Sequence, residues 1–421
     1  MGGTLISVHH PVKARVVALT PRRRRTMLFG VSDSRTRRLG SLALLDNRYP
    51  ALHGLRVFAI LSVVQHHITW IFVGEEKLSL PRDLMTLSIS TFFGMDLFFI
   101  LSGFLIGSIL FHSIEVAGTP QLGRFYLRRM FRTFPSYWIV LTVLVLTSFL
   151  TDQQRAHLQY EYTYLTNFVP IGRKSIVMLW GWSLALEEQF YLVVPFFLFA
   201  LTKLRSDRGR LALLLGTCSL GTVIRLVVYL RGGPWDNVTL HDELYFHTYT
   251  RFDTLVAGIL LAFVHRRWGK ELTLWLRAPI HRALLALPSL TLLWVLWFPS
   301  AVYGEHLQLF EVFAWGTLTS FMYFPALILL LHTDGPIGRF LGLPLFRKAA
   351  TLGYGVYLVH IPLIDNLVVP LAHIADRKHV PHEWLWLGGT FIAMSASLAV
   401  GYMMHVLIEK PSLALRDKLA A

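Results

Sequence analysis

The chain has 421 residues, of which 54% are hydrophobic and 15% are charged, and its mean hydropathy is +0.51. Because soluble proteins carry about 25% charged residues, this composition excludes an ordinary soluble enzyme and predicts an all-α fold, a polytopic bundle of transmembrane helices. The net charge of +15 is concentrated in short loops between apolar segments, which is typical of cytoplasmic loops and does not indicate nucleic-acid binding.

Residues 1–48 come first and contain no long apolar run, but they include four consecutive arginines, Arg22 to Arg25. Without an apolar h-region, we expect no secretory signal peptide here. We interpret the segment as a basic, disordered cytoplasmic extension that helps to orient the first span. A lipid-surface tether or a regulatory arm is the alternative.

The first predicted span, residues 55–73, carries two ionisable side chains eleven residues apart, Arg56 and His67. Eleven residues make about three helical turns and about 16 Å of rise, so both side chains share one helix face. With Arg56 at one membrane surface, His67 lies near mid-membrane, where an ionisable group indicates function. A neutral imidazole there can act as a general base toward a hydroxyl. A buried histidine satisfied by a neighbouring helix is the alternative.

Nine further apolar segments follow, and the loops between them alternate between basic and acidic. The basic loops, which we predict to be cytoplasmic, are residues 112–133, 203–210, 265–282 and 332–349. The alternation requires residues 151–202 to make one net crossing, with 151–185 as a short buried helix or a re-entrant piece. We therefore predict ten spans and both termini in the cytoplasm. The spans are residues 55–73, 91–111, 134–150, 186–202, 211–230, 251–265, 283–303, 312–331, 350–368 and 385–407.

The first basic loop contains arginines that can share one face of an interfacial helix: Arg128, Arg129 and Arg132. Guanidinium groups bind phosphate oxygens through paired hydrogen bonds, so this face is a candidate site for an anionic cytosolic donor. Spacing alone favours the alternative, ordinary positive-inside charge in contact with lipid headgroups.

Two adjacent acids, Glu187 and Glu188, stand at the start of the span 186–202. Glu187 can orient the His67 imidazole or bind an acceptor, and the alternative is an interfacial acid beside an aromatic belt. In the span 350–368, Tyr354, Tyr357 and His360 recur at steps of three. They either line a substrate cavity or hydrogen-bond between packed helices, and the same two interpretations apply to Asp96 and Arg251.

Seven segments, in this order, resemble the acyltransferase 3 family of integral-membrane acyltransferases. They cover residues 50–412 and read LRVFAILSVVQHH, GMDLFFILSGFLIG, FYLRRMFRTFPSYW, WSLALEEQFYLVVP, TRFDTLVAGILLA, LGYGVYLVHIPLI and IEKP. The resemblance implies a ten-span helical domain that uses cytosolic acyl-CoA, often acetyl-CoA, to O-acylate a carbohydrate or another hydroxyl compound.

The motifs of this family fall on individual residues of the chain. Its arginine–histidine motif falls on Arg56 and His67, and its arginine pair falls on Arg129 and Arg132 or on Arg128 and Arg132. Its glutamate falls on Glu187 and its YL-x-H histidine on His360. Two departures are Val57-Phe58, where the family has small residues, and the doubled His66-His67. The predicted site therefore has His67 and Glu187 as catalytic residues, arginines 56, 128, 129 and 132 as the acyl-CoA site, and a substrate cavity with His360, Tyr357, Arg251 and Asp96.

We divide the chain into the extension 1–48, a transmembrane acyltransferase domain at 49–412 and a cytoplasmic tail at 413–421. Because it ends at Ala421, we expect a stand-alone transferase without an extra periplasmic domain. The expected location is the cytoplasmic (inner) membrane of a bacterium. The expected partners are acyl-CoA as co-substrate, a hydroxyl acceptor and membrane lipid, with no bound cofactor, metal or nucleic acid. The competing hypothesis is a proton-coupled transporter or flippase with His67 and Glu187 as its relay.

Overall fold

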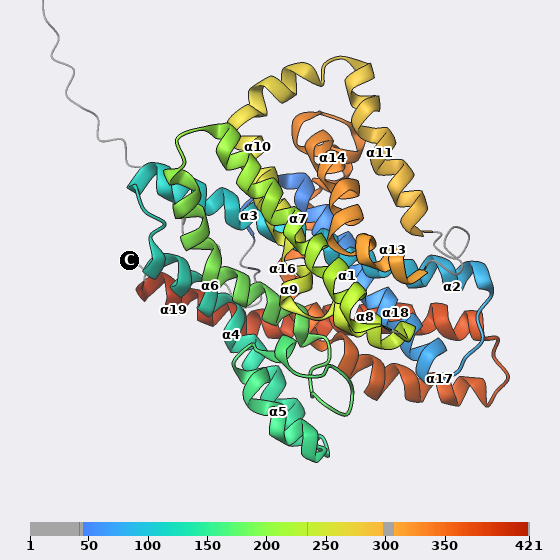
Figure 1. Cartoon of the computed structure of the whole chain (residues 1–421). Helices are drawn as coiled ribbons and strands as arrows, with labels where there is room; N and C mark the ends of the chain where they lie inside the picture. Colours follow the sequence, from blue (N-terminus) through green and yellow to red (C-terminus); the bar gives the residue numbers. More distant parts are fainter. Residues whose placement is uncertain (1–41, 43–44, 234, 298–306, 420–421) are drawn as a thin grey trace, which may run out of the picture. The chain divides into compact units, whose positions relative to one another are not determined.

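The computed structural model describes residues 42, 45–233, 235–297 and 307–419, and all regular secondary structure in these ranges is helical (Figure 1). The prediction of an all-α protein is therefore confirmed. Residues 1–41, most of the predicted basic extension, lie outside the described residues.

Long helices account for most of the described chain. They are α1 (Pro50–Thr69), α3 (Gly94–Ala117), α4 (Leu122–Thr147), α6 (Gly181–Lys203), α7 (Asp207–Gly232), α10 (Asp253–Trp275), α11 (Pro279–Trp297), α14 (Thr319–His332), α16 (Pro344–Leu363) and α18 (His382–Met404). Shorter elements extend or connect them: η2 (Trp70–Glu75), α2 (Arg82–Ile89), η3 (Ser90–Phe93), α5 (Asp152–Tyr162), η4 (Thr166–Phe168), α8 (Asn237–Tyr245), α9 (Thr248–Arg251), α13 (Leu307–Phe313), η6 (Ala314–Leu318), α15 (Pro336–Leu341), η7 (Ile364–Val368), α17 (Val369–Asp376), η8 (His405–Glu409) and α19 (Lys410–Leu419).

Nine helices of the described part are long and apolar enough to cross a membrane, and each coincides with one of the ten predicted spans. The tenth predicted span, residues 251–265, is α10, which is not among the nine. In this helix, only residues 254–265 lie between charged residues, Asp253 on one side and Arg266 and Arg267 on the other, if histidine is not counted as charged. These residues make about 18 Å of helix. This length is shorter than the hydrocarbon layer of a membrane, which is about 30 Å thick. Composition alone therefore does not identify α10 as a membrane span.

The arginine cluster lies inside a long helix and not in a separate interfacial one. Helix α4 begins at Leu122 and continues through Pro135 to Thr147, although the sequence placed residues up to 133 in a loop. A proline inside a helix leaves the carbonyl four residues earlier without its backbone donor. Here that carbonyl, of Phe131, accepts a hydrogen bond from the Ser412 hydroxyl at 2.7 Å. Ser412 of α19 therefore replaces the missing backbone donor, and this hydrogen bond holds α19 against α4.

Helices α3 and α10 pack at backbone distance because glycines face each other. A Cβ atom on Gly103 would lie 2.0 Å from the carbonyl oxygen of Leu255, and one on Gly258 would lie 2.2 Å from that of Ile100. Small residues at such contacts are typical of helix pairs in membranes. This contact forms the centre of the largest buried apolar cluster.

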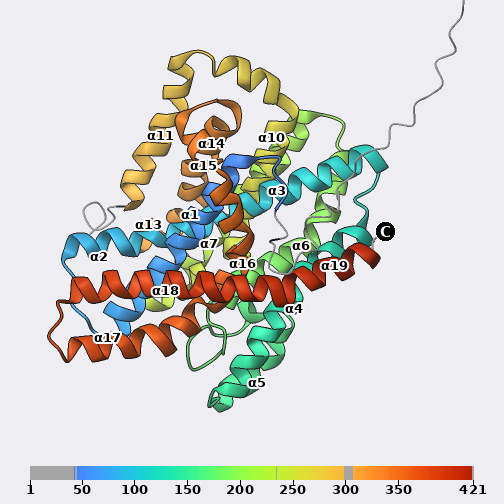
Figure 2. The same ribbon diagram turned by 180° about the vertical axis from the view of Figure 1, so that it is seen from behind.

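Helix α1 packs against α3 and α16, and α16 packs against α18. In Figure 2, α18, η8 and α19 form one long rod (red) that passes beside α16 and α4. The end of the bundle where α3 and α6 end and α4 and α7 begin carries Arg124, Lys203 and Arg208, and we call it the basic end. Helix α1 begins near it, with Arg56 in its second turn.

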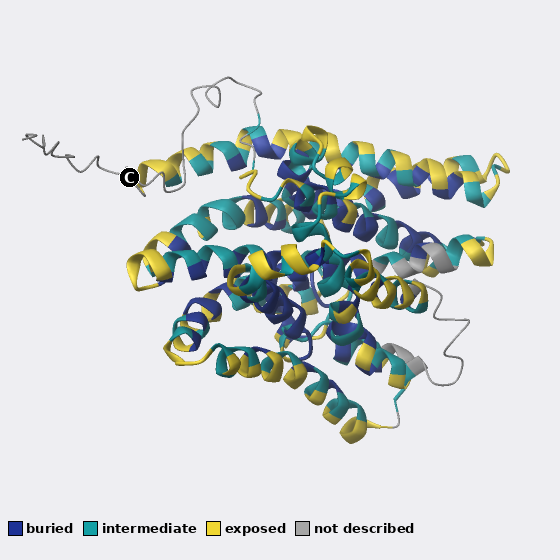
Figure 3. Ribbon diagram, turned by 90° about the horizontal axis from the view of Figure 1, so that it is seen from above, coloured by how far each residue is buried: buried dark blue, intermediate teal, exposed yellow. Residues whose placement is uncertain are grey.

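Exposed residues lie along the helix faces that point away from the core (Figure 3), and many of them are large and apolar. Leu284, Leu287 and Leu290 on α11 are each more than half exposed, as are Leu192 and Phe196 on α6. An exposed surface of this kind is expected where lipid is the solvent. The protein is therefore an integral membrane protein.

The region 151–185 consists of one short helix and a long loop. Thr151 and Gln154 form a capping box at the start of α5. At its end, the buried Glu161 carboxylate accepts hydrogen bonds from the backbone N–H groups of Val177 and Met178, both at 2.8 Å. Burial raises the pKa of Glu161, and these two donors act against that shift. Glu161 thereby fixes the loop that leads into α6.

Candidate active site

His67 on α1 and His360 on α16 are in hydrogen-bond contact. Nδ1 of His67 lies 2.9 Å from Nε2 of His360, and the ring centroids are 4.9 Å apart. His360 is fully buried, and its Nδ1 lies 2.6 Å from the backbone oxygen of Tyr357. The packing of α1 on α16 thus joins two residues that the sequence indicated separately.

The partners of the two rings determine which nitrogens carry protons. A carbonyl oxygen only accepts, so Nδ1 of His360 is protonated and donates to Tyr357. In a neutral His360 ring, Nε2 is then the acceptor, and His67 donates to it from Nδ1. A neutral His67 is left with a lone pair on Nε2, which is the state that a general base requires.

A largely apolar cavity with about 370 Å³ of empty space lies between α1, α3, α6 and α16, and we call it the central cavity. Its α1 wall consists of Ala59, Ile60 and Val63, which lie on the helical face that carries Arg56 and His67. The cavity therefore follows this face between the two. The other lining residues are Met95, Phe98, Phe99, Ser183, Leu184, Glu187, Gly353, Tyr354 and Tyr357.

Arg56, at the other end of this face, lies near two arginines of α4. The charged groups that act on it most strongly are Arg132, Arg129 and Glu187. The Arg129 guanidinium also lies over the ring of Tyr191, 5.5 Å from its centroid. Three guanidinium groups close together repel one another in a medium of low dielectric constant. The cluster is therefore suited to an anion with several charges.

Arg128 is not among the charged groups that act most strongly on Arg56. Its charged neighbours are Arg124, Arg416, Asp417 and Arg129, which places it toward α19 and the basic end. Of the two arginine pairs that the sequence left open, Arg129 with Arg132 is thus the one beside Arg56.

Glu187 lies among the arginines rather than beside His67. It is 8% exposed, and its neighbours are Ser102, Arg129, Arg56 and Tyr191. Its Oε1 atom has no hydrogen-bond partner. The described residues include no contact between Glu187 and His67, whose imidazole is bound by His360 instead. The sequence-based idea that Glu187 orients His67 thus has no support in the geometry.

Two tyrosines of α16 line the central cavity and bind its neighbouring elements. The Tyr357 hydroxyl donates to the backbone oxygen of Trp180 at 2.9 Å and contacts the Ser183 hydroxyl at 2.5 Å. The Tyr354 hydroxyl donates to the backbone oxygen of Thr133 on α4 at 2.9 Å. Their three-residue spacing therefore reflects contacts to α6 and α4 as well as the cavity.

A second cavity with about 290 Å³ of empty space lies between α4, α16, η8 and α19, and we call it the Glu409 cavity. Its lining residues are Leu45, Arg132, Thr351, Tyr354, His405, Glu409 and Leu413. His405 Nδ1 and Glu409 Oε2 are 2.7 Å apart. Glu409 belongs to the IEKP segment, but its partner His405 was missed, although a histidine and an acid four residues apart at the end of an apolar span were a usable signal.

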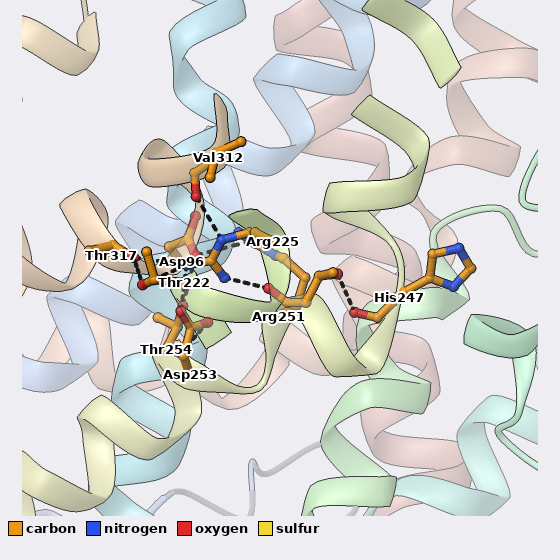
Figure 4. Close-up of polar contacts among 10 residues, drawn as sticks. Asp96, Thr222, Arg225, His247, Arg251, Asp253, Thr254, Val312 and Thr317 are labelled. Atoms are coloured by element: carbon orange, nitrogen blue, oxygen red, sulfur yellow. Dashed lines mark hydrogen bonds and ion pairs between the residues drawn. The ribbon is translucent and has the colours of Figure 1, made fainter. Parts of the chain in front are cut away.

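Asp96 and Arg251 belong to a separate buried cluster and do not line either cavity (Figure 4). They form an ion pair at 3.0 Å, with both side chains fully buried. Beside them, Arg225 binds Asp253 at 2.8 Å and also donates to backbone oxygens of Val312 and Thr250. Arg225 was missed, although it is a charged residue in the interior of the predicted span 211–230.

The cluster of Figure 4 coincides with a break in the helix formed by α13 and α14. Trp315 and Gly316 leave the helical conformation, and Gly316 has a φ of +73°. A Cβ on Gly316 would lie 2.3 Å from the Asp253 carboxylate, so only glycine fits there. The cluster thus holds α7, α10 and the broken helix together.

The segment 169–180, which we call the strap, is fastened to the ends of α1 and α16 that lie beyond the histidines. Arg173 donates to Glu75 at 2.6 Å and to both carboxylate oxygens of Asp365, at 2.7 and 3.1 Å. At the other end of the strap, the Trp180 ring contacts that of His360, with centroids 6.1 Å apart. The strap therefore contacts the histidine pair on the side that faces away from Arg56, Arg129 and Arg132.

Comparison with known proteins gives one family. The family model described as an acyltransferase domain, acyltransferase 3, matches residues 49–406. A peptidoglycan O-acetyltransferase of Listeria monocytogenes is 26% identical over 378 residues, which are 83% of this chain and 54% of the relative. A Bacillus subtilis protein provisionally named as a peptidoglycan O-acetyltransferase is 28% identical over 358 residues, 78% of this chain and 51% of the relative.

The chain thus spans about half the length of these two curated relatives. A Staphylococcus aureus protein provisionally named as an O-acetyltransferase is 27% identical over 231 residues, 51% of this chain and 34% of the relative. No solved structure matches the chain significantly.

Proposed function

Because the chain belongs to the acyltransferase 3 family, we propose that it is a membrane O-acyltransferase that moves an acetyl group from cytosolic acetyl-CoA to a hydroxyl of a carbohydrate. The cavity along the α1 face between Arg56 and His67 is the observation that supports this most directly. Neither Arg56 nor His67 lines this cavity, but they stand on the same helical face before and after its α1 wall, as an anion site and a proton acceptor.

The proposed topology has ten crossings, with α10 as the sixth and with the basic end in the cytoplasm of a bacterium. Helix α10 has a kink at Trp268, so its straight part, residues 253–267, measures about 22 Å, and its close packing against α3 keeps one side of it out of contact with lipid. The basic end then obeys the positive-inside rule. Residues 49–412 form the transferase domain in this proposal, with the extension 1–48 and the tail 413–421 outside it.

The donor enters at the basic end, where CoA is found. Its phosphates bind the group formed by Arg56, Arg129 and Arg132, whose mutual repulsion favours a polyanion. The pantetheine arm extends through the central cavity, whose apolar wall suits a chain of methylene groups. The thioester then lies near the histidine pair. Glu187 offsets part of the positive charge beside the arginines and positions Arg129.

The acyl transfer follows from the proton positions of the two histidines. Nε2 of His67 takes the proton of the acceptor hydroxyl while the hydroxyl oxygen attacks the thioester carbonyl. A C–O bond forms and the C–S bond breaks. The departing thiolate takes the proton from His67, which restores the neutral ring. His360 accepts the hydrogen bond from His67 Nδ1 throughout, so Nε2 is the nitrogen that takes the proton and gives it up again.

The acceptor approaches from the side of the strap, opposite the donor. The names of the relatives assign O-acetylation of peptidoglycan to one of them and provisionally to another, which supports a cell-surface carbohydrate as the acceptor here. A donor from the cytoplasm and an acceptor from the other side meet at His67 without a transport step.

The test uses the purified full chain in detergent with radiolabelled acetyl-CoA and N-acetylglucosamine oligosaccharides. The expected result is labelled oligosaccharide together with an equal amount of free CoA thiol, both absent in a His67→Gln variant. Flux of a substrate across proteoliposomes without any acetylation would establish the transporter instead and overturn the proposal.

A further inference from the structure

The Glu409 cavity combines two groups of opposite charge that do not neutralise each other directly. Arg132 lines it from α4, and Glu409 lines it from η8. Glu409 is the acid that acts most strongly on Arg132, but no hydrogen bond between them is present in the described part of the chain. The cavity therefore offers a cation and a separate hydrogen-bond acceptor to one ligand.

The Glu409 carboxylate is only half satisfied by the protein. It is 8% exposed, and its Oε2 accepts from His405 at 2.7 Å. Its Oε1 is buried and has no hydrogen-bond partner. A buried carboxylate oxygen without a donor is strongly unfavourable. The missing partner has to be an N–H or O–H group.

The position of this carboxylate is fixed by the surrounding helices. The bond from Ser412 to the backbone oxygen of Phe131 holds the start of α19 against α4, next to Arg132. Tyr354 lines both the Glu409 cavity and the central cavity, and its hydroxyl is held by Thr133. The two cavities therefore adjoin each other at Tyr354.

We propose that the Glu409 cavity binds the junction between the diphosphate and the pantetheine arm of the acyl-CoA donor. Arg132 binds a phosphoryl oxygen there, and Glu409 Oε1 accepts from the pantetheine hydroxyl or the first amide N–H. This inference rests on the proposed use of acetyl-CoA and assigns the donor a defined entrance.

Simple anions do not fit this combination of groups. Inorganic phosphate has a P–OH donor, but this donor belongs to the anionic group itself and brings the negative charge against Glu409, whereas the junction of CoA presents an anion and a neutral donor a few bonds apart. A phosphoethanolamine lipid headgroup also combines a phosphate with a donor, so the experiment has to separate this source from CoA.

Acetyl donors of decreasing length distinguish binding of CoA in this cavity from binding of a lipid headgroup. Acetyl-CoA carries phosphates, hydroxyl and both amides. S-acetylpantetheine lacks the phosphates, and the thioester of N-acetylcysteamine also lacks the hydroxyl and the first amide. The KM and kcat of the full chain are measured in detergent with each donor, for the natural protein and for Glu409→Leu, Glu409→Gln and Arg132→Met.

We expect Glu409→Leu to raise the KM for acetyl-CoA and for S-acetylpantetheine by at least about ten-fold relative to its effect on the cysteamine thioester. Glu409→Gln retains an acceptor oxygen and should have a smaller effect in the same order. The matched variant Arg132→Met should show its penalty with acetyl-CoA and lose it with S-acetylpantetheine, because only acetyl-CoA has the phosphates.

An equal change in KM for all three donors, or none, would overturn the inference, and a lipid headgroup as the natural occupant predicts such an outcome. If Glu409→Leu does not fold, as judged by its unfolding temperature, the same comparison with Glu409→Gln decides. Failure of the natural protein to transfer acetyl from any of the three donors would instead refute the proposed function, so the two failures are distinct.

Discussion

Nε2 of His360 lies 2.9 Å from Nδ1 of His67, although the two residues are 293 positions apart in the sequence. Because His360 Nδ1 is already committed to the backbone oxygen of Tyr357, the two neutral rings have only one arrangement of protons. The unprotonated nitrogen at the end of this chain is Nε2 of His67. Four predictions test this site and the structure around it.

His67→Gln should lower acetyl transfer by at least about 100-fold, because the general base is lost. Release of free CoA thiol in the presence of oligosaccharide measures the rate. The matched control is His66→Gln, which changes the adjacent ring on another side of the helix and should retain most activity. A His67→Gln variant with normal turnover would remove His67 from the mechanism, and loss in the control alone would move the base to His66.

His360→Phe should lower kcat by at least about ten-fold with little change in the KM for acetyl-CoA, because His67 loses the acceptor that fixes its tautomer. His360→Gln retains an oxygen that can accept from His67 and should recover part of the rate. Steady-state kinetics of both variants give the comparison. If both lose the same activity, His360 acts only as a packing residue and the tautomer argument is wrong.

Asp253→Asn should destabilise the protein by about 3–5 kcal/mol, because it leaves the guanidinium of Arg225, fully buried, without its counter-ion. The unfolding temperature in detergent should fall on the order of 10 °C. The control Asp417→Asn removes the partner of Arg416 from a carboxylate that is 60% exposed, and its effect should stay below about 1 kcal/mol. Equal effects at the two sites would contradict the role given to the buried pair.

Arg173→Gln should increase hydrogen exchange in the strap, residues 169–180, because it removes the hydrogen bonds to Glu75 and Asp365. All three side chains are about one-third exposed, so global stability should change by no more than about 1 kcal/mol. Exchange followed by mass spectrometry on peptides of this segment is the measurement. Lys174→Gln, which removes a neighbouring positive charge, should leave the exchange as it is; unchanged exchange in Arg173→Gln would show that other contacts fasten the strap.

The sequence was sufficient for features that depend on one helix at a time. Helical periodicity places Arg56 and His67 on one face of α1, and the wall of the central cavity lies along that face. Hydropathy also located nine of the spans, although the ends of the helices differ from the predicted ends by up to twelve residues. The arginine face of α4 was recognised, but its inclusion in the membrane helix was not, because the arginines placed it in the basic loop 112–133 as a separate interfacial helix.

Contacts between helices were the part that periodicity does not determine. A helical face is readable from spacing, but the helix that it contacts is chosen by packing over long sequence distances. Spacing therefore left the partner of Glu187 open between the His67 imidazole and an acceptor, and packing places this acid beside Arg56 and Arg129. The contact of His67 with His360, the pairing of Arg225 with Asp253 and the cavity around Glu409 depend on the same kind of long-range packing.

Arg56 and His67 belong to one uninterrupted helix, so movements of the surrounding helices do not change the distance between them. In the proposed function, α1 thus fixes the distance between the arginine that binds the donor phosphates and the imidazole that acts as the base. One residue inserted between Arg56 and His67 would turn the imidazole about 100° away from the cavity, whereas four would return it to nearly the same face about 6 Å further on. An acyl chain longer than acetyl would then extend beyond His67, on the side away from Arg56. The residues there, and not the arginines, would select the length of the chain.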